Sequence, residues 1–181
     1  MYDMSDDIKE ILISNDEIKK KVQELGKKIS EDYRGKDLML VGILKGSVPF
    51  MADLLREITI PCTMDFMAVS SYGNSTKSSG VVRILKDLDF EIHNKHILIV
   101  EDIIDSGITL SYLLDYLKGR KPNSIEIACL LNKEERRKVN VNSKYIGFQV
   151  PDYFLVGFGL DYAEKYRNLP YVGVLKDDVY K

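Results

Sequence analysis

Acidic and hydroxyl side chains gather in one short segment, VEDIIDSGITL at residues 100–110. Glu101, Asp102 and Asp105 are followed by Ser106, Gly107, Ile108 and Thr109. A Ser-Gly-x-Thr turn is typical of loops whose backbone N–H groups bind an anion such as a phosphate. Carboxylates repel anions, so the acidic half of the segment needs hydroxyl groups or a cation as its partners. The segment therefore predicts a ligand that carries a phosphate as well as hydroxyls or a bound metal ion.

A purely structural interpretation of this segment is a helix N-cap. Asp105 or Ser106 would satisfy the first backbone N–H groups of the helix that begins near Thr109. A cap explains one acid only. It does not explain Glu101 and Asp102, which follow each other where a strand is expected to end at Val100. Without partners, these two carboxylates would repel each other and would pay a desolvation cost.

Apolar runs that alternate with helical stripes predict the elements that position this segment. Buried strands are expected at 38–44 (LMLVGIL), 96–100 (HILIV) and 124–131 (SIEIACLL). Such a chain is typical of an α/β fold with a mostly parallel sheet flanked by helices. Ligands bind at the carboxyl ends of the strands of such a sheet. The loops after Leu44, Val100 and Leu131 are thus the places to look for a site.

Helix signals separate these strands. Ser14 and Glu17 form a capping box before an apolar stripe of Ile18, Val22, Leu25 and Ile29. Ser47 is a candidate cap for a second helix, with Pro49 in its first turn. A third stripe, from Leu110 to Leu117, stops at Gly119. Short strands with glycines between them are expected at IGFQV, FLVGFGL and YVGVL, near the end of the chain.

Composition limits the classes of protein. A chain of 181 residues favours a single domain over residues 1–181, and a net charge of −2 gives no bulk attraction to nucleic acid. No apolar run is long enough to span a membrane, and the acidic start of the sequence is unlike a signal peptide. Cys62 and Cys129 lack metal or redox spacing and are expected to be buried thiols. A cytoplasmic location is the expectation.

The segment at 100–110 resembles the phosphoribosyl pyrophosphate (PRPP) motif of the type I phosphoribosyltransferases, in the form used by the branch that acts on 6-oxopurines. Further matches follow in the family's order from about Ile11 to Leu175. They are Leu44-Lys45-Gly46-Ser47, Ser71-Tyr72, Lys133, Pro151-Asp152-Tyr153-Phe154 with Leu155, Gly159-Leu160-Asp161-Tyr162, and Arg167. The resemblance implies a type I phosphoribosyltransferase core with a small hood built from about residues 1–14 and 150–181.

The reaction implied by the resemblance is Mg²⁺-dependent. The 5-phosphoribosyl group passes from PRPP to hypoxanthine or guanine and gives IMP or GMP plus pyrophosphate. Asp105 would be the general acid/base at purine nitrogen 7, and residues 105–109 would hold the 5-phosphate. One departure is Ile108, where some relatives carry Lys. Glu101 and Asp102 would face away from that phosphate, toward the ribose hydroxyls, directly or through Mg²⁺.

The resemblance assigns the remaining roles as well. Lys45, Gly46 and Arg167 would meet the pyrophosphate, and the family implies a cis peptide at Leu44-Lys45. Lys133 would donate to the 6-oxo group, which favours 6-oxopurines over adenine. The purine would lie against Phe154 and Leu155, with Asp161 beside the purine or the metal. Ser71 and Tyr72 would open a flexible lid, and the family implies a homodimer or homotetramer.

Some of these residues also have a purely structural interpretation. The charged run at 134–138 (EERRK) reads as a solvated helix face, and Phe154 by composition alone is an ordinary core residue. Two other functions also stay open. The fold could serve a PRPP-sensing regulator that binds nucleic acid, which the acidic balance disfavours, or an enzyme that prefers xanthine, which the residues around Lys133 do not exclude.

Overall fold

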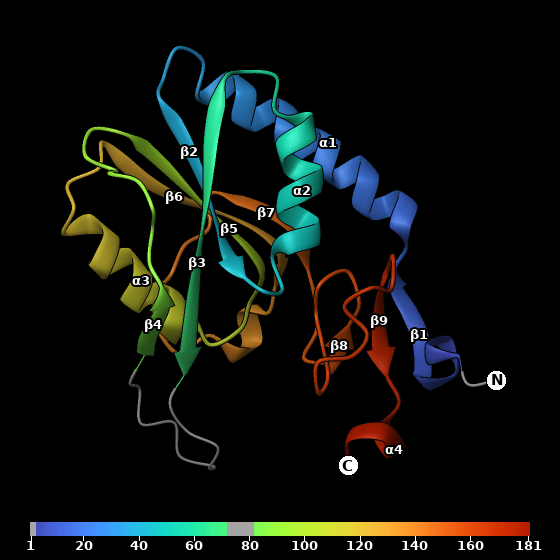
Figure 1. The fold of residues 1–181 in the computed structure, drawn as a ribbon. Coiled ribbons are helices and arrows are strands. Elements are labelled where there is room, and N and C mark those ends of the chain that lie inside the picture. Colours follow the sequence, from blue (N-terminus) through green and yellow to red (C-terminus); the bar gives the residue numbers. More distant parts are fainter. Residues whose placement is uncertain (1–2, 72–81) are drawn as a thin grey trace.

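Two sheets of unequal size organise the chain in the computed structural model, which describes residues 3–71 and 82–181 (Figure 1). The larger sheet has the strand order β4-β3-β2-β5-β6-β7, with every neighbouring pair parallel except β3 and β4. Its strands are β2 (Leu38–Leu44), β3 (Cys62–Ser71), β4 (Val82–Lys86), β5 (His96–Ile104), β6 (Ser124–Asn132) and β7 (Tyr145–Gln149). The predicted mostly parallel sheet is confirmed.

Helices cover both faces of this sheet. Helices α1 (Asn15–Asp32) and α2 (Val48–Glu57) pack on one face, and α3 (Ile108–Lys118) lies on the other (Figure 1). Side chains of β2 alternate between the two cores, since Leu38 and Leu40 face α1 and α2 while Met39 and Val41 face α3. This two-sided burial explains why the run LMLVGIL is apolar throughout.

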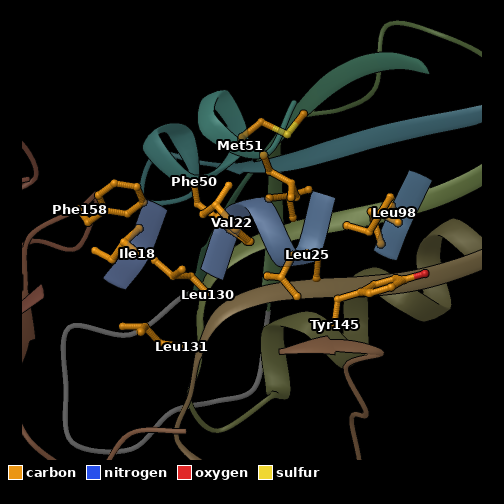
Figure 2. Packing of buried hydrophobic residues seen from close by; sticks show 14 of the residues in the cluster. Ile18, Val22, Leu25, Phe50, Met51, Leu98, Leu130, Leu131, Tyr145 and Phe158 are labelled. Carbon is orange, nitrogen blue, oxygen red and sulfur yellow. The ribbon is translucent and has the colours of Figure 1, made fainter. Parts of the chain in front are cut away.

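The predicted stripe of α1 is buried along its whole length. Figure 2 shows Ile18, Val22 and Leu25 beside Phe50 and Met51 of α2, over the strands of the sheet. The capping box is present too. Ser14 Oγ accepts from the backbone N–H of Glu17, and the Glu17 carboxylate accepts from the backbone N–H of Ser14 at 2.8 Å.

The smaller sheet joins the two ends of the chain. It has the antiparallel order β1-β9-β8, from β1 (Ile8–Ile13), β9 (Val172–Leu175) and β8 (Leu155–Val156). A short helix α4 (Asp177–Tyr180) follows β9, and Figure 1 shows this group beside one end of the large sheet. The predicted hood is therefore present. FLVGFGL forms only a two-residue strand, because the backbone turns at Gly157 (φ +95°) and Gly159 (φ +100°).

Three local predictions were wrong. Strand β5 does not end at Val100, because its pairing with β6 continues to Ile104 opposite Asn132. Ser47 precedes α2 but its side chain makes no capping bond, and its buried hydroxyl has no hydrogen-bond partner among the described residues. Cys62 is only half-buried, while Cys129 is buried as expected.

The direction in which successive strands are added to the large sheet reverses between its two central strands, β2 and β5, which are parallel. From β2 the chain continues through α2 to β3 on one side, and from β5 it continues through α3 to β6 on the other. The loops after β2, β5 and β6 therefore meet at one edge, which is where open parallel sheets bind ligands. Among the described residues, no helix is both long and apolar enough to cross a bilayer.

Candidate active site

The loop after β2 is packed against both β5 and the hood at Gly46. A Cβ atom at Gly46 would lie 1.7 Å from Asp102 Oδ2, so only glycine fits there. A Cβ atom at Gly159 of the hood would lie 1.9 Å from the Gly46 carbonyl oxygen. The Leu44–Lys45 peptide before this turn is cis. The backbone of this predicted pyrophosphate loop is thus fixed by two close contacts.

Two basic side chains border this loop from opposite sides. The Lys45 ammonium lies 2.8 Å from Glu164 Oε2, and both side chains are about two-thirds exposed, at 67% and 64%. Arg167 donates to the Gly159 carbonyl at 2.7 Å and pairs with Asp161 Oδ1 at 2.9 Å. The Nε atom of Arg167 is buried without a hydrogen-bond partner in the described part of the chain. The predicted pyrophosphate residues Lys45 and Arg167 are therefore held by hood residues.

The loop between β5 and α3 encloses a cavity of about 190 Å³. Gly107 is the residue before the helix, and its φ of +80° is a conformation that favours glycine. The cavity is lined by Glu101, Ile103, Ile104, Asp105, Ser106, Gly107, Thr109 and Leu110. With the amino end of α3 at its border, this cavity has the features of an anion site.

Glu101 lines the same cavity as Ser106 and Thr109, and its predicted orientation away from a bound phosphate stays a prediction. Glu101 and Asp102 are consecutive residues of β5. The two side chains hydrogen-bond to each other, so the two carboxyls lie together. Asp102 Oδ2 also lies against Gly46 of the loop after β2.

Burial raises the pKa of the Glu101 carboxyl well above its ordinary range, and the neighbouring Asp102 charge adds to the effect. Burial also raises the pKa of Asp102. Two adjacent buried carboxyls of this kind fit a divalent cation, whose charge favours their ionised forms. Asp161 does not join them, because the described residues hold no group of three acidic, histidine or cysteine side chains arranged to bind a metal. Mg²⁺ needs no such group, since it is commonly bound through one or two carboxylates plus substrate phosphates.

A second, larger cavity of about 380 Å³ adjoins the first. The two share Ile103 and Asp105. Asp105 Oδ1 is buried and makes no hydrogen bond in the described structure, although Arg136 Nε lies 3.2 Å away as an ion-pair partner. The other residues that line this cavity are Lys133, Arg136, Asp152, Tyr153, Phe154, Leu155, Leu160, Asp161 and Tyr180. The predicted purine residues are all brought together here.

Lys133 is the buried cation of this larger cavity, with 7% of its surface exposed. Its ammonium donates to the Tyr153 carbonyl at 2.6 Å and lies 3.5 Å from Asp152 Oδ1. These two contacts fix the position of the ammonium group in the cavity wall. Asp152 also pairs with Arg136 at 3.4 Å, so one carboxylate links two basic residues of the wall.

The interpretation of residues 134–138 as a solvated face agrees with the exposure of Glu134, Glu135, Arg136 and Lys138 and is wrong for Arg137, which is half-buried. Only a 3₁₀ turn, Glu134–Arg136, forms there. Arg136 reaches Asp105, and Arg137 donates to three oxygens, the Asp105 carbonyl at 3.2 Å, the Val141 carbonyl and the Asn132 side chain. A charge run gives no signal for these contacts, because they depend on how the loop folds back over the end of β5.

Phe154 is surface-exposed at 36%, so the interpretation as an ordinary core residue does not apply. Its ring stacks on that of Tyr180, with centroids 4.4 Å apart, and meets the edge of Tyr162 at 5.6 Å. No sequence pattern predicted the contact with Tyr180, which lies 26 residues further along the chain. Ser71 is the last residue of β3, and Tyr72, the other predicted lid residue, lies outside the described residues.

Comparisons with known proteins agree with this architecture. Residues 9–163 match the phosphoribosyl transferase domain family. The hypoxanthine-guanine phosphoribosyltransferase of Bacillus subtilis is 55% identical over 178 residues, which cover 98% of this chain and 99% of the relative. The bifunctional protein TilS/HprT of Listeria monocytogenes is 51% identical over 98% of this chain, which spans 27% of that protein. The crystal structure of a hypoxanthine phosphoribosyltransferase from Staphylococcus aureus superposes with a TM-score of 0.96, at 50% identity over 98% of this chain and 97% of the other.

A phosphate-type loop at the switch point of a parallel sheet, closed by a hood from the chain ends, defines the class. The chain belongs to the type I phosphoribosyltransferase family. Within that family it falls among the hypoxanthine-guanine phosphoribosyltransferases, the enzymes of purine salvage.

Proposed function

We propose that the two adjoining cavities bind PRPP and a 6-oxopurine base side by side, and that the chain transfers the 5-phosphoribosyl group to hypoxanthine or guanine. The observation that carries the proposal is the position of Asp105, which borders both the phosphate-type cavity and the larger cavity. A group at that junction is close to both reactants, as a general acid/base must be.

The 5-phosphate is assigned to the smaller cavity. Backbone N–H groups of residues 105–109, the hydroxyls of Ser106 and Thr109 and the amino end of α3 supply its donors. Ile108 adds no charge to this loop, so backbone donors supply most of the binding. Lys45, Gly46 and Arg167 are assigned to the pyrophosphate, where the loop after β2 meets the hood.

The base is assigned to the larger cavity. The Lys133 ammonium is a donor only, so it accepts a 6-oxo group as partner and rejects a 6-amino group. Phe154 offers an aromatic face for stacking, beside Leu155 and Asp161. During transfer a purine ring nitrogen forms a bond to carbon 1 of the ribose as the bond from that carbon to pyrophosphate breaks. Asp105 takes the proton from nitrogen 7 of the base.

Glu101 and Asp102 are the residues that would hold Mg²⁺ and the ribose hydroxyls. When bound, the cation neutralises charge on the leaving pyrophosphate. Both carboxyls are stabilised in their ionised form by a cation or by hydroxyl donors, which offsets the cost of their burial. Asp161 is the less suitable metal ligand, because Arg167 and the Glu164 backbone N–H already engage its two oxygens.

The test is nucleotide formation from purified protein, Mg²⁺, PRPP and one base at a time. We expect IMP from hypoxanthine and GMP from guanine, with no product from adenine. Absence of product with both oxopurines would contradict the proposal. Xanthine added in competition with hypoxanthine and guanine in the same assay shows which 6-oxopurine the enzyme prefers.

Two further assignments belong to the proposal. We place the enzyme in the cytoplasm, where the free thiols Cys62 and Cys129 stay reduced. We also propose assembly as a homodimer or homotetramer, to be measured by light scattering, where a monomer mass would contradict it.

A further inference from the structure

Tyr180, near the end of the chain, contacts the residue assigned to purine stacking. Its ring lies nearly parallel to that of Phe154, with 23° between the planes and 4.4 Å between centroids. Tyr162 meets Phe154 edge-on, with 87° between the planes. Two tyrosines thus restrict the Phe154 ring from two directions, although it is otherwise a partly exposed residue of an irregular segment.

Tyr180 also borders the base cavity itself, together with Lys133 and Leu155. Backbone bonds fix the two segments relative to each other, because the Leu175 N–H donates to the Phe154 carbonyl at 2.9 Å. The segment after β9 is anchored in turn to the start of the chain, where the Lys176 N–H donates to the Asp7 carbonyl at 2.9 Å. The start of the chain therefore anchors the C-terminal segment that carries Tyr180 into the cavity wall.

We infer that Tyr180 is a positioning residue of the base site, which holds the Phe154 ring in the plane that a purine needs for stacking. The inference rests on the proposed function of the larger cavity. A purine is planar, and it gains from stacking only if the ring beneath it is already oriented. With one Phe154 face covered by Tyr180, the base stacks on the other side of the same two-ring pair.

The ring of Tyr180, and not its hydroxyl, performs this role. The hydroxyl donates to Asp177 Oδ1 at 2.9 Å, within α4. Tyr180→Phe should therefore retain the function, whereas Tyr180→Ala should lose it. This difference separates stacking from a hydrogen-bonding role.

The first experiment measures KM for hypoxanthine, KM for PRPP and kcat. For Tyr180→Ala we expect KM for hypoxanthine to rise about tenfold, within the range seen when a base loses an aromatic stacking partner. KM for PRPP and kcat should change less than twofold, and Tyr180→Phe should match the wild type. Unchanged KM for hypoxanthine, or an equal rise in both KM values, would overturn the inference.

The second experiment uses the absence of tryptophan from this sequence. In Tyr180→Trp the new indole is the only one, and IMP binding should change its fluorescence because it borders the cavity. Tyr112→Trp is the matched control, since Tyr112 stacks on Tyr116 of α3 and does not line either cavity. An unchanged fluorescence of Tyr180→Trp at saturating IMP would overturn the inference. This test remains available if Tyr180→Ala fails to fold.

Failure of the proposed function is recognised separately. If wild-type protein makes no nucleotide, the assignment of the cavities fails. If wild-type protein is active and the Tyr180 variants behave like it, only the inference about Tyr180 fails.

Discussion

Asp105 is the residue at which the two cavities meet, and its role follows from that position. Adjacent acids in the sequence indicated a ligand, but an N-cap explained Asp105 equally well. The structure shows that Gly107 is the residue before α3 and that Ser106 Oγ, not the Asp105 carboxylate, accepts from the first backbone N–H of this helix, that of Ile108, at 3.4 Å. The carboxylate of Asp105 is therefore not engaged as a cap and faces the cavities.

Asp105→Asn removes the proton acceptor and keeps the shape of the side chain. We expect kcat to fall about a hundredfold or more, the usual contribution of a general acid/base, while KM for PRPP changes little. Steady-state kinetics check this, with Asp115→Asn on the exposed side of α3 as control. A variant with the kcat of the wild type would show that Asp105 is not the proton acceptor.

Gly46 is a second residue whose identity is dictated by its neighbours. Gly46→Ala places a Cβ atom where Asp102 Oδ2 lies, so the loop or the carboxylate must move. We expect kcat/KM for PRPP to fall at least tenfold, with the melting temperature nearly unchanged. Gly119→Ala is the matched control, because a Cβ there meets only the Tyr116 carbonyl at 3.3 Å. Equal kinetics of the two variants would contradict the close contact.

At the scale of elements, the extension of β5 decides how the acidic pair is used. Sequence patterning ended this strand at Val100, because Glu101 and Asp102 interrupt the apolar run. Pairing with β6 carries the strand four residues further, so that Glu101 and Asp102 are strand residues whose side chains hydrogen-bond to each other. When polar residues near the end of a buried strand serve to bind a ligand, their position in the sequence does not show where the strand ends.

Arg137 ties the phosphate loop to its surroundings. Its guanidinium bonds the Asp105 carbonyl, and the Lys138 N–H donates to the Ser106 carbonyl at 3.0 Å. Arg137→Met should loosen this loop and raise KM for PRPP about tenfold, since bonds to a charged group contribute roughly 1.5–3 kcal/mol. PRPP titration checks this against Arg34→Met, a control at an exposed position of the chain. A normal KM would exclude Arg137 from positioning the loop.

Tyr145 joins the edge strand β7 to the end of α1 through a 2.7 Å bond to Asp32 Oδ2. That bond lowers the pKa of Asp32 below its ordinary value of 3.8. For a lowered carboxyl pKa, the added stability is present above the unfolded pKa and is lost as pH falls through the folded one. Tyr145→Phe should lower the free energy of unfolding by about 1 kcal/mol at neutral pH.

Urea unfolding of Tyr145→Phe and wild type at a series of pH values measures this difference. The difference in the free energy of unfolding between the two proteins should become smaller as the pH falls below 3.8, where Asp32 becomes protonated. Tyr112→Phe, an exposed position, is the control. A difference that is the same at every pH would show that the bond to ionised Asp32 is not its cause.

At the scale of the whole molecule, the core sheet and the hood border the same ligand cavities. Lys133 and Asp105 come from the core, and Phe154 and Tyr180 come from the hood. A ligand that binds both parts stabilises the folded state as a unit, by about 2.7 kcal/mol at one hundred times its Kd.

We therefore expect PRPP with Mg²⁺ to raise the melting temperature, and EDTA to remove most of that rise. The second effect follows from the buried carboxyls Glu101 and Asp102, which need a cation to tolerate a nearby pyrophosphate. Scanning calorimetry of wild-type protein measures both, with ribose 5-phosphate as the matched ligand that lacks pyrophosphate. Equal melting temperatures with and without EDTA would argue against a metal at these residues.

The sequence by itself determined the alternation of strands and helices, the capped helix α1, the phosphate loop and the order of the site segments. These features are local, because periodicity, capping and turn chemistry act within a few residues. Tertiary structure alone decided that Glu101 lines the cavity between β5 and α3, that Arg136 and Arg137 contact Asp105, and that Tyr180 stacks on Phe154. Those contacts join residues distant in the chain, so their energies depend on the arrangement of the sheet and the hood, which no local pattern encodes.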